Sequence, residues 1–204
     1  MRFLACGDAA VLVEVADLDA VLALYRAVRA HTPTAVVEVV PAARTVLLHF
    51  DRERTTASAV EQAVRGLPAV EPETGDHGTV RVPVVYDGDD LAEVARLTGL
   101  SEREVVEAHV GTEWTVAFGG FAPGFGYLAG GDRRLVVPRR QESRTRVPTG
   151  AVGLAGEFSG IYPRESPGGW QLIGHTDTEI WQADRNPPAL LRPGVRVRFD
   201  EVRS

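Results

Sequence analysis

The sequence predicts an α+β protein with a small α+β domain at residues 1–75 and a closed or sandwiched β domain at residues 76–204. Three observations predict this organisation. Residues 1–67 repeat a unit of two strand-like runs and one amphipathic helix. The Pro-, Gly- and acid-rich stretch at residues 68–78 is typical of a linker. From residue 114 onward, Gly and Pro separate short apolar runs, a pattern typical of a closed or sandwiched β domain.

The N-terminal domain is predicted to hold two helices on one face of a four-stranded antiparallel sheet, which buries the apolar stripes of both helices. Asp17 can cap the first helix, because apolar residues recur at helical spacing from Leu18 to Val28. Residues 55–67 repeat this spacing and predict the second helix. The four strands are expected at residues 2–5, 9–15, 35–40 and 45–50.

The second domain is predicted to begin with a strand at residues 80–86 and two short helices at residues 91–98 and 101–110. Ser101 has Glu104 three residues after it, the spacing of a capping box, and this supports the start of the second of these helices. The rest of the domain is expected to be β-structure. Its strands are predicted at residues 115–118, 135–138, 151–155, 161–163, 171–174, 178–181 and 196–199.

The composition excludes several classes of protein. A net charge of −6 argues against a nucleic-acid-binding protein, whose domain is normally basic. All 22 basic residues are Arg, so this chain supplies neither a Walker A lysine nor a Schiff-base lysine. A single cysteine, an N-terminus without a continuous apolar stretch and the lack of any run of about 18 apolar residues predict a cytoplasmic protein that does not enter the membrane.

Residues 119–128 form a Gly-rich aromatic motif, GGFAPGFGYL. Glycine permits positive φ and lets the backbone approach a ligand closely, and phenylalanine can wall an apolar slot. Phe121, Gly124 and Phe125 are therefore candidate binding residues. The alternative is a tight barrel corner whose aromatic side chains fill the core, and the pattern alone leaves both interpretations open.

Six arginines lie between residues 133 and 146 of an otherwise acidic protein. Because Arg binds carboxylates and phosphates through two parallel hydrogen bonds, this stretch predicts a local anion site. The VPTG sequence at residues 147–150 constrains the chain directly after the last arginine. Arg140, Arg144 and Arg146 are the candidate anion ligands, and a solvated surface is the alternative.

Residues 160–176 form a third motif, GIYPRESPGGWQLIGHT. Its SPGG turn presents Trp170 and Gln171 at the start of a strand. Gln171 both donates and accepts hydrogen bonds, which suits recognition of a planar amide, although a structurally satisfied glutamine is the simpler interpretation. Gly168, Gly169, Trp170 and Gln171 are candidate substrate-binding residues.

The five histidines show no spacing typical of a metal site, so no set of metal ligands is expected in this chain. His109 precedes the Gly-rich motif and His175 follows Gln171. Either can serve as a general acid or base. His109 is the candidate catalytic residue, and a structural role is the alternative for each histidine.

Three long motifs together resemble one protein family. They are HVGTEWTVAFGGFAPGFGYL at residues 109–128, VPRRxxxRTRVPTGAVGLAG at residues 137–156 and the third motif at residues 160–176. With them the chain resembles the PxpB/KipI family, also described as allophanate hydrolase subunit 1 or the carboxyltransferase subdomain C and D family. The resemblance covers essentially the whole chain and implies that the barrel domain is cyclophilin-like. Two departures are a short loop at residues 87–90, where the family often has a longer Gly-rich stretch, and His175, where Arg is common.

The resemblance implies the PxpB component of a bacterial ATP-dependent 5-oxoprolinase, which opens 5-oxo-L-proline to L-glutamate. It implies a PxpA-like and a PxpC/KipA-like protein as partners, with ATP bound at a site that these partners complete, so the isolated chain is expected to be inactive. Two alternatives stay open within the family: a KipI-like inhibitor of a sensor histidine kinase, and the carboxyltransferase component of a urea carboxylase or allophanate-type system. In the enzyme, we expect the arginines to clamp anions, Gln171 to contact the substrate and His109 to transfer a proton.

Overall fold

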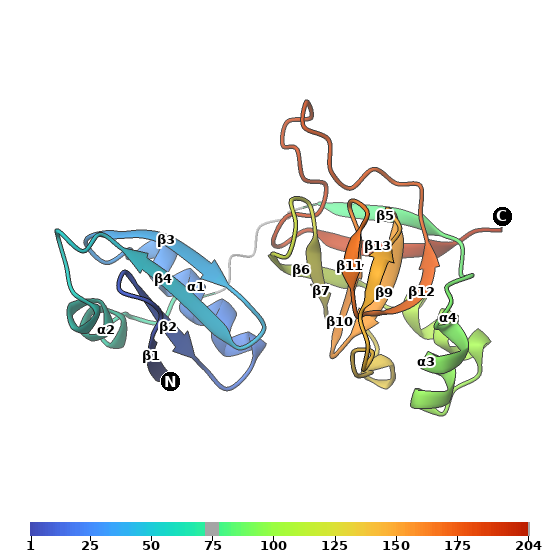
Figure 1. Cartoon of the computed structure of the whole chain (residues 1–204), viewed down its shortest axis with the longest axis horizontal. Coiled ribbons are helices and arrows are strands. Elements are labelled where there is room, and N and C mark those ends of the chain that lie inside the picture. Colours follow the sequence, from blue (N-terminus) through green and yellow to red (C-terminus); the bar gives the residue numbers. More distant parts are fainter. Residues whose placement is uncertain (72–77, 204) are drawn as a thin grey trace. The chain divides into compact units, whose positions relative to one another are not determined.

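The computed structural model describes residues 1–71 and 78–203 of the chain. The chain divides into two compact units, Met1–Gly75 and Asp76–Ser204, each with its own hydrophobic core (Figure 1). Residues 72–77 of the predicted linker lie outside the described residues. Among the described residues, no helix is both long enough and apolar enough to cross a membrane.

The N-terminal unit is a four-stranded antiparallel sheet with two helices, as predicted. Alternating strand residues, such as Val13 of β2 and Leu48 of β4, share one core with the buried valines of both helices, so both helices pack on one face. Asp17 caps α1 by accepting a hydrogen bond from the Ala20 amide at 2.9 Å. The sheet order is β1-β2-β4-β3. The elements are β1 (Arg2–Ala5), β2 (Ala10–Glu14), α1 (Leu18–Ala30), β3 (Val36–Pro41), β4 (Thr45–Phe50) and α2 (Ala57–Arg65).

The second unit is built on a seven-stranded sheet of order β12-β9-β10-β7-β6-β13-β5, which curls into a barrel. A pair of backbone hydrogen bonds between Val85 and His175, each 2.9 Å long, joins the end of β5 to β12 and closes it. A separate two-stranded sheet pairs β11 with β8. The strands are β5 (Thr79–Val84), β6 (Trp114–Gly119), β7 (Gly126–Ala129), β8 (Arg144–Val147), β9 (Ala151–Ala155), β10 (Phe158–Ile161), β11 (Ser166–Gly168), β12 (Gln171–His175) and β13 (Arg196–Glu201).

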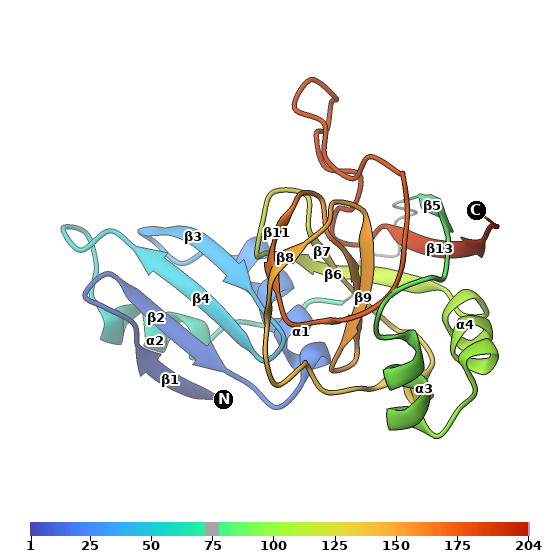
Figure 2. The ribbon, with the colours of Figure 1, turned by 45° about the vertical axis from the view of Figure 1, so that its right-hand side comes forward.

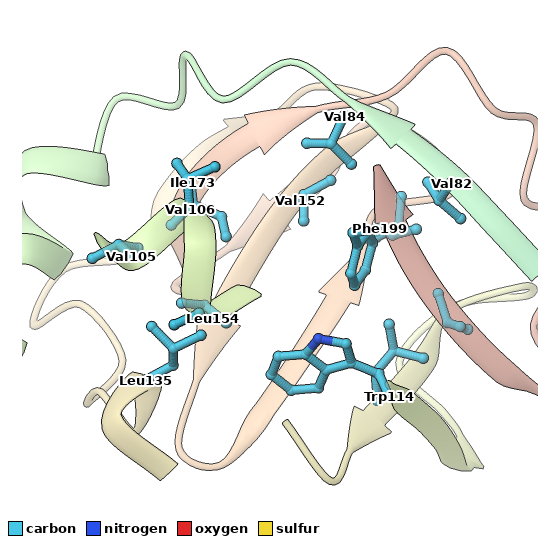
Figure 3. Close-up of a cluster of buried hydrophobic side chains, with 14 of the residues drawn as sticks. Val82, Val84, Val105, Val106, Trp114, Leu135, Val152, Leu154, Ile173 and Phe199 are labelled. Carbon is cyan, nitrogen blue, oxygen red and sulfur yellow. The ribbon is translucent and has the colours of Figure 1, made fainter. Parts of the chain in front are cut away.

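Two helices, α3 (Leu91–Thr98) and α4 (Glu102–Val110), lie against each other beside the barrel (Figure 2). The capping box predicted at Ser101 is present, because its hydroxyl accepts from the Glu104 amide while the Glu104 carboxylate accepts from the Ser101 amide. Side chains of α4 join those of the barrel strands around Trp114 and Phe199 in one core (Figure 3). The predicted fold class, an α+β domain followed by a β-barrel domain, is confirmed.

Three of the predicted strands are wrong in detail. Residues 133–135 form a short 3-10 helix, η1 (Arg133–Leu135), and only Val137 makes a β-bridge, so the strand predicted at residues 135–138 is absent. The strand predicted at residues 161–163 lies earlier, as β10. Residues 178–181 contribute a single bridge between Trp181 and Ala189. Pro138 and Pro163 end two of these runs, and a proline cannot donate a ladder hydrogen bond.

Three strands were not predicted, because their residues are unlike those of an ordinary strand. β7 lies inside the Gly-rich motif, β8 has the sequence RTRV, and β11 has the sequence SPG. β8 and β11 pair only with each other, in a small sheet where Arg and Pro are tolerated. This small sheet carries Arg144, Arg146 and Gly168, so it determines where three of the candidate residues lie.

Candidate functional site

The aromatic residues of the Gly-rich motif and the third motif gather in one cluster. The Phe125 ring makes edge contacts with the rings of Phe121, Tyr162 and Trp170, with centroids 5.3–5.9 Å apart within the group. Phe125 and Trp170 are buried. These two predicted binding residues therefore pack inside the aromatic cluster and leave little surface for a ligand, and their binding role stays a prediction.

Phe121 differs from the rest of this cluster because its side chain is 56% exposed. Its backbone has a φ of +65°, in the left-handed region that costs energy for a residue with a Cβ. The neighbouring Gly124 also has a positive φ of +86° and lies so close to Trp181 that an added Cβ would come within 2.8 Å of the Trp181 Cβ. The turn thus holds an aromatic side chain outward at the rim of the cluster.

Replacing Gly160 by Ala tests how tightly the aromatic cluster is packed. A Cβ at this position would lie 2.8 Å from Phe125 Cζ and 3.0 Å from Trp170 Cζ3, so one of two buried rings must move. We expect a loss of about 1–3 kcal/mol in the free energy of unfolding, measured by urea denaturation. Gly119→Ala is the control, because its nearest contact is an ordinary 3.7 Å to the Phe125 carbonyl oxygen. Equal stability of both variants would contradict tight packing.

Two of the three candidate anion ligands converge on a buried carboxylate. Arg144 donates to both oxygens of Asp90 at 2.8 and 2.9 Å, and Arg140 donates to Asp90 Oδ1. The Leu172 amide donates to Asp90 Oδ2 at 2.7 Å. Asp90 is only 2% exposed, so this carboxylate joins the start of α3 to β8 and β12 from inside the protein.

The charge state of Asp90 follows from this environment. Burial raises the pKa of Asp90, but hydrogen bonds from Arg144 and the Leu172 amide, together with the charges of both arginines, outweigh burial and hold the pKa below its ordinary value. Asp90 is thus ionised at neutral pH and neutralises part of the charge of Arg140 and Arg144. Arg140 and Arg144 are therefore already bound to an anion of the protein itself, the Asp90 carboxylate.

Sequence reasoning missed Asp90. The residue stands at the N-cap position of α3, yet its side chain makes no capping hydrogen bond and turns to the arginines instead. Its partners are 50, 54 and 82 residues away in the sequence, so no local pattern marks it. The available signal was an aspartate directly before an apolar helix, which ordinarily indicates only a cap.

Arg146 lies apart from the other two arginines. It pairs with Glu165 at 2.6 Å, and its side chain is 76% exposed. The structure therefore does not bring Arg140, Arg144 and Arg146 together in one clamp. The reason is that Arg144 turns inward to Asp90, while Arg146 finds its partner in the loop before β11.

His109 lies in the core of the barrel unit with no exposed surface. Its Nδ1 is 2.7 Å from the Tyr86 hydroxyl, its Nε2 is 2.9 Å from the Ser159 hydroxyl, and its ring stacks on Phe199. Burial lowers the pKa of His109 from 6.5 to about 3. A proton-transfer group must reach the reacting atoms, and His109 offers them no exposed surface, so its catalytic role stays a prediction that this burial does not support.

A pocket of about 410 Å³ lies beside α3 and brings Arg140 and Gln171 together. Gln171 Nε2 donates to the Pro138 carbonyl at 3.2 Å, and the Arg140 amide donates to the Gly169 carbonyl at 2.8 Å. A Cβ on Gly169 would come within 2.8 Å of Ser143 Oγ, so the SPGG turn lies close to this loop. The pocket is lined by Glu93, Arg96, Leu97, Pro138, Arg139, Arg140, Gln141, Glu142 and Gln171.

The other candidate residues, Gly168 and His175, are not part of this pocket lining. Gly168 packs on the Tyr162 ring, where a Cβ would overlap the phenol. His175 pairs with Asp87 at 2.8 Å on the surface. Within residues 1–71 and 78–203 there is no group of three His, Cys, Asp or Glu side chains placed to hold a metal ion.

The chain is similar to proteins of one family over most of its length. The family described as carboxyltransferase domain, subdomain C and D, matches residues 1–191. The chain is 44% identical over 169 residues to the B subunit of the 5-oxoprolinase of Escherichia coli O157:H7, an alignment that covers 80% of this chain and 77% of that protein.

Solved structures agree with this relationship. The crystal structure of TTHA0988 superposes with a TM-score of 0.75 at 36% identity over 96% of this chain, which spans only 40% of that longer chain. Urea amidolyase of Kluyveromyces lactis superposes with a TM-score of 0.78 at 20% identity, over 98% of this chain and 15% of that chain, and shares the fold. The chain belongs to the carboxyltransferase domain, subdomain C and D, family, and the B subunit of the E. coli 5-oxoprolinase is its homologue.

Proposed function

We propose that this protein is the B subunit of a cytoplasmic ATP-dependent 5-oxoprolinase, which opens 5-oxo-L-proline to L-glutamate together with a PxpA-like and a PxpC/KipA-like partner. The observation that carries this proposal is the 44% identity across 77% of the E. coli protein. The isolated chain is expected to be inactive, because the relative is by name one part of an assembly.

The chemistry of the reaction fits a shared active site. A lactam is a resonance-stabilised amide, so opening it at neutral pH requires activation of its carbonyl oxygen, for which phosphoryl transfer from ATP is suited. Such a transfer needs cations at the phosphoryl group and at the substrate carboxylate. This chain offers arginines and an amide side chain around one pocket but contains neither Lys nor a phosphate-binding loop motif. We infer that the partners supply the ATP site.

The carboxyltransferase alternative is less well supported. The likeness to urea amidolyase, at 20% identity, supports a shared fold only. A carboxyltransferase of this type needs a biotin carrier, and a chain without Lys cannot itself carry biotin. The kinase-inhibitor alternative needs surface contacts by this chain alone and no small-molecule site.

The test is 5-oxoproline-dependent ATP hydrolysis, with glutamate measured as the product. The protein is co-purified with its PxpA-like and PxpC/KipA-like partners, and the same mixture without this chain is the control. We expect ATP hydrolysis to follow glutamate formation and to fall to the background rate without the chain. Equal rates with and without the chain would overturn the proposal, and inhibition of a sensor histidine kinase would then be measured.

A further inference from the structure

The pocket beside α3 contains a cation that the protein leaves unpaired. Arg140 and Arg96 both line the pocket, but Asp90 and Glu93 respectively bind their guanidinium groups. Arg139 also lines the pocket and is exposed, and within the part of the chain that the structure describes its side chain has no hydrogen bond or ion pair. Burial raises the pKa of Tyr127 and that of Tyr162, and the nearby charge of Arg139 opposes this rise. Of the three arginines that line the pocket, Arg139 is therefore the one whose charge no carboxylate of the described residues matches.

Two residues that line the pocket also hold buried polar atoms without hydrogen-bond partners. Within the described residues, three buried side-chain nitrogen or oxygen atoms lack a hydrogen bond, and two of them, Arg140 Nε and Gln171 Oε1, belong to pocket residues. The third, Arg26 Nε, lies in α1 of the other unit. Buried polar groups in folded proteins are nearly always paired, so a donor and an acceptor left open at one pocket indicate a ligand that pairs with both.

The open atoms define the chemistry of this ligand. Gln171 Nε2 already donates to Pro138, which leaves the Oε1 oxygen as an acceptor, whereas Arg140 Nε is a donor. A lactam presents its N–H and its carbonyl oxygen side by side on one edge, because the ring holds its amide in the cis form. The N–H matches Gln171 Oε1, and the carbonyl oxygen matches Arg140 Nε.

We propose that the pocket between α3 and the loop at residues 138–142 binds the carboxylate of a cyclic amide acid at Arg139 and its lactam edge at Arg140 Nε and Gln171 Oε1. The inference rests on the proposed function, which identifies this ligand as 5-oxoproline. Both unpaired atoms are buried, each with less than 1 Å² exposed, so binding as proposed requires an outward shift of the loop. Arg139 acts here as a binding residue and takes no part in bond breaking.

The test compares Arg139→Gln with Arg133→Gln in the assembled enzyme. Both residues are exposed arginines of the same basic stretch without an ion pair among the described residues, but Arg133 does not line the pocket. We expect Arg139→Gln to raise the KM for 5-oxoproline by about tenfold or more, as for loss of a charge-assisted contact, with the KM for ATP unchanged. Arg133→Gln should keep the wild-type KM.

Two inhibitors test the two halves of the ligand separately. 2-Pyrrolidinone retains the lactam and lacks the carboxylate, so its inhibition constant should be the same for wild type and Arg139→Gln. Cyclopentanecarboxylate retains the carboxylate and lacks the amide, so it should bind wild type more weakly than 5-oxoproline does. A wild-type KM in Arg139→Gln, or equal binding of cyclopentanecarboxylate and 5-oxoproline, would overturn the pocket while leaving the proposed function intact. An assembled wild-type enzyme without 5-oxoproline turnover would overturn both.

Discussion

Asp90→Ala is expected to destabilise the barrel unit by about 3–5 kcal/mol, because the substitution leaves two arginines without their shared counter-charge. Asp90 accepts from Arg140, Arg144 and the Leu172 amide while only 2% exposed. Its removal also leaves the buried Leu172 amide without an acceptor, which adds to the cost. The loss is measured as a lower urea midpoint at neutral pH.

Asp89→Ala is the matched control for this prediction. The adjacent carboxylate lies 3.6 Å from Arg144, but its side chain is 81% exposed. Exposed ion pairs contribute only about 0–1 kcal/mol, so the control should unfold close to wild type. Similar losses in the two variants would show that Asp90 has no special structural role.

The lowered pKa of Asp90 allows a second test, the dependence of the free energy of unfolding on pH. Because the folded pKa lies below the unfolded value of about 3.9, the stabilisation is complete above that value and is lost as the pH falls through the folded pKa. Asp90→Asn should lack this part of the acid dependence. An Asn variant whose stability falls below pH 4 as steeply as that of wild type would contradict the assignment.

His109 is expected to make the protein sensitive to acid over a higher pH range. Burial lowers its folded pKa to about 3, so between pH 6.5 and 3 the unfolded chain binds a proton that the folded chain does not. The free energy of unfolding should therefore fall by about 1.4 kcal/mol for each pH unit in this range from His109 alone. Urea denaturation at intervals of half a pH unit measures the slope.

A variant without a titrating group at this position isolates the effect. His109→Gln should be less stable than wild type at pH 8, because the contacts to Tyr86 and Ser159 are disturbed, but should lose the slope between pH 6.5 and 5. His175→Gln is the control, because that ring is partly exposed on the surface, and it should retain the slope. A full slope in His109→Gln would mean that other groups cause the acid sensitivity.

Much of the fold was predictable because local sequence signals favour the same helices and strands that the tertiary structure contains. Asp17 and Ser101 mark helix starts by their own hydrogen bonds, and alternating apolar residues mark the central strands. β8 and β11 were missed because a two-stranded sheet imposes little apolar pattern on RTRV or SPG. Their pairing depends on residues about 20 positions apart, which no short window contains.

The site was only partly predictable, because residue type gives chemistry but not location. Arg140 and Gln171 line one pocket, and their predicted binding roles stay predictions. Arg144 is instead committed to Asp90, and the buried His109 has the same residue type as a catalytic base. Arg139 differs from its neighbour Arg140 only in what its side chain contacts, so the sequence alone gives no reason to prefer it.

The most direct test of this account is to locate 5-oxoproline in the assembled enzyme by crystallography or electron cryomicroscopy. We expect the substrate in the pocket beside α3, with its carboxylate at Arg139 and its lactam edge at Arg140 and Gln171. Substrate bound wholly within a partner protein, with no contact to this pocket, would contradict it.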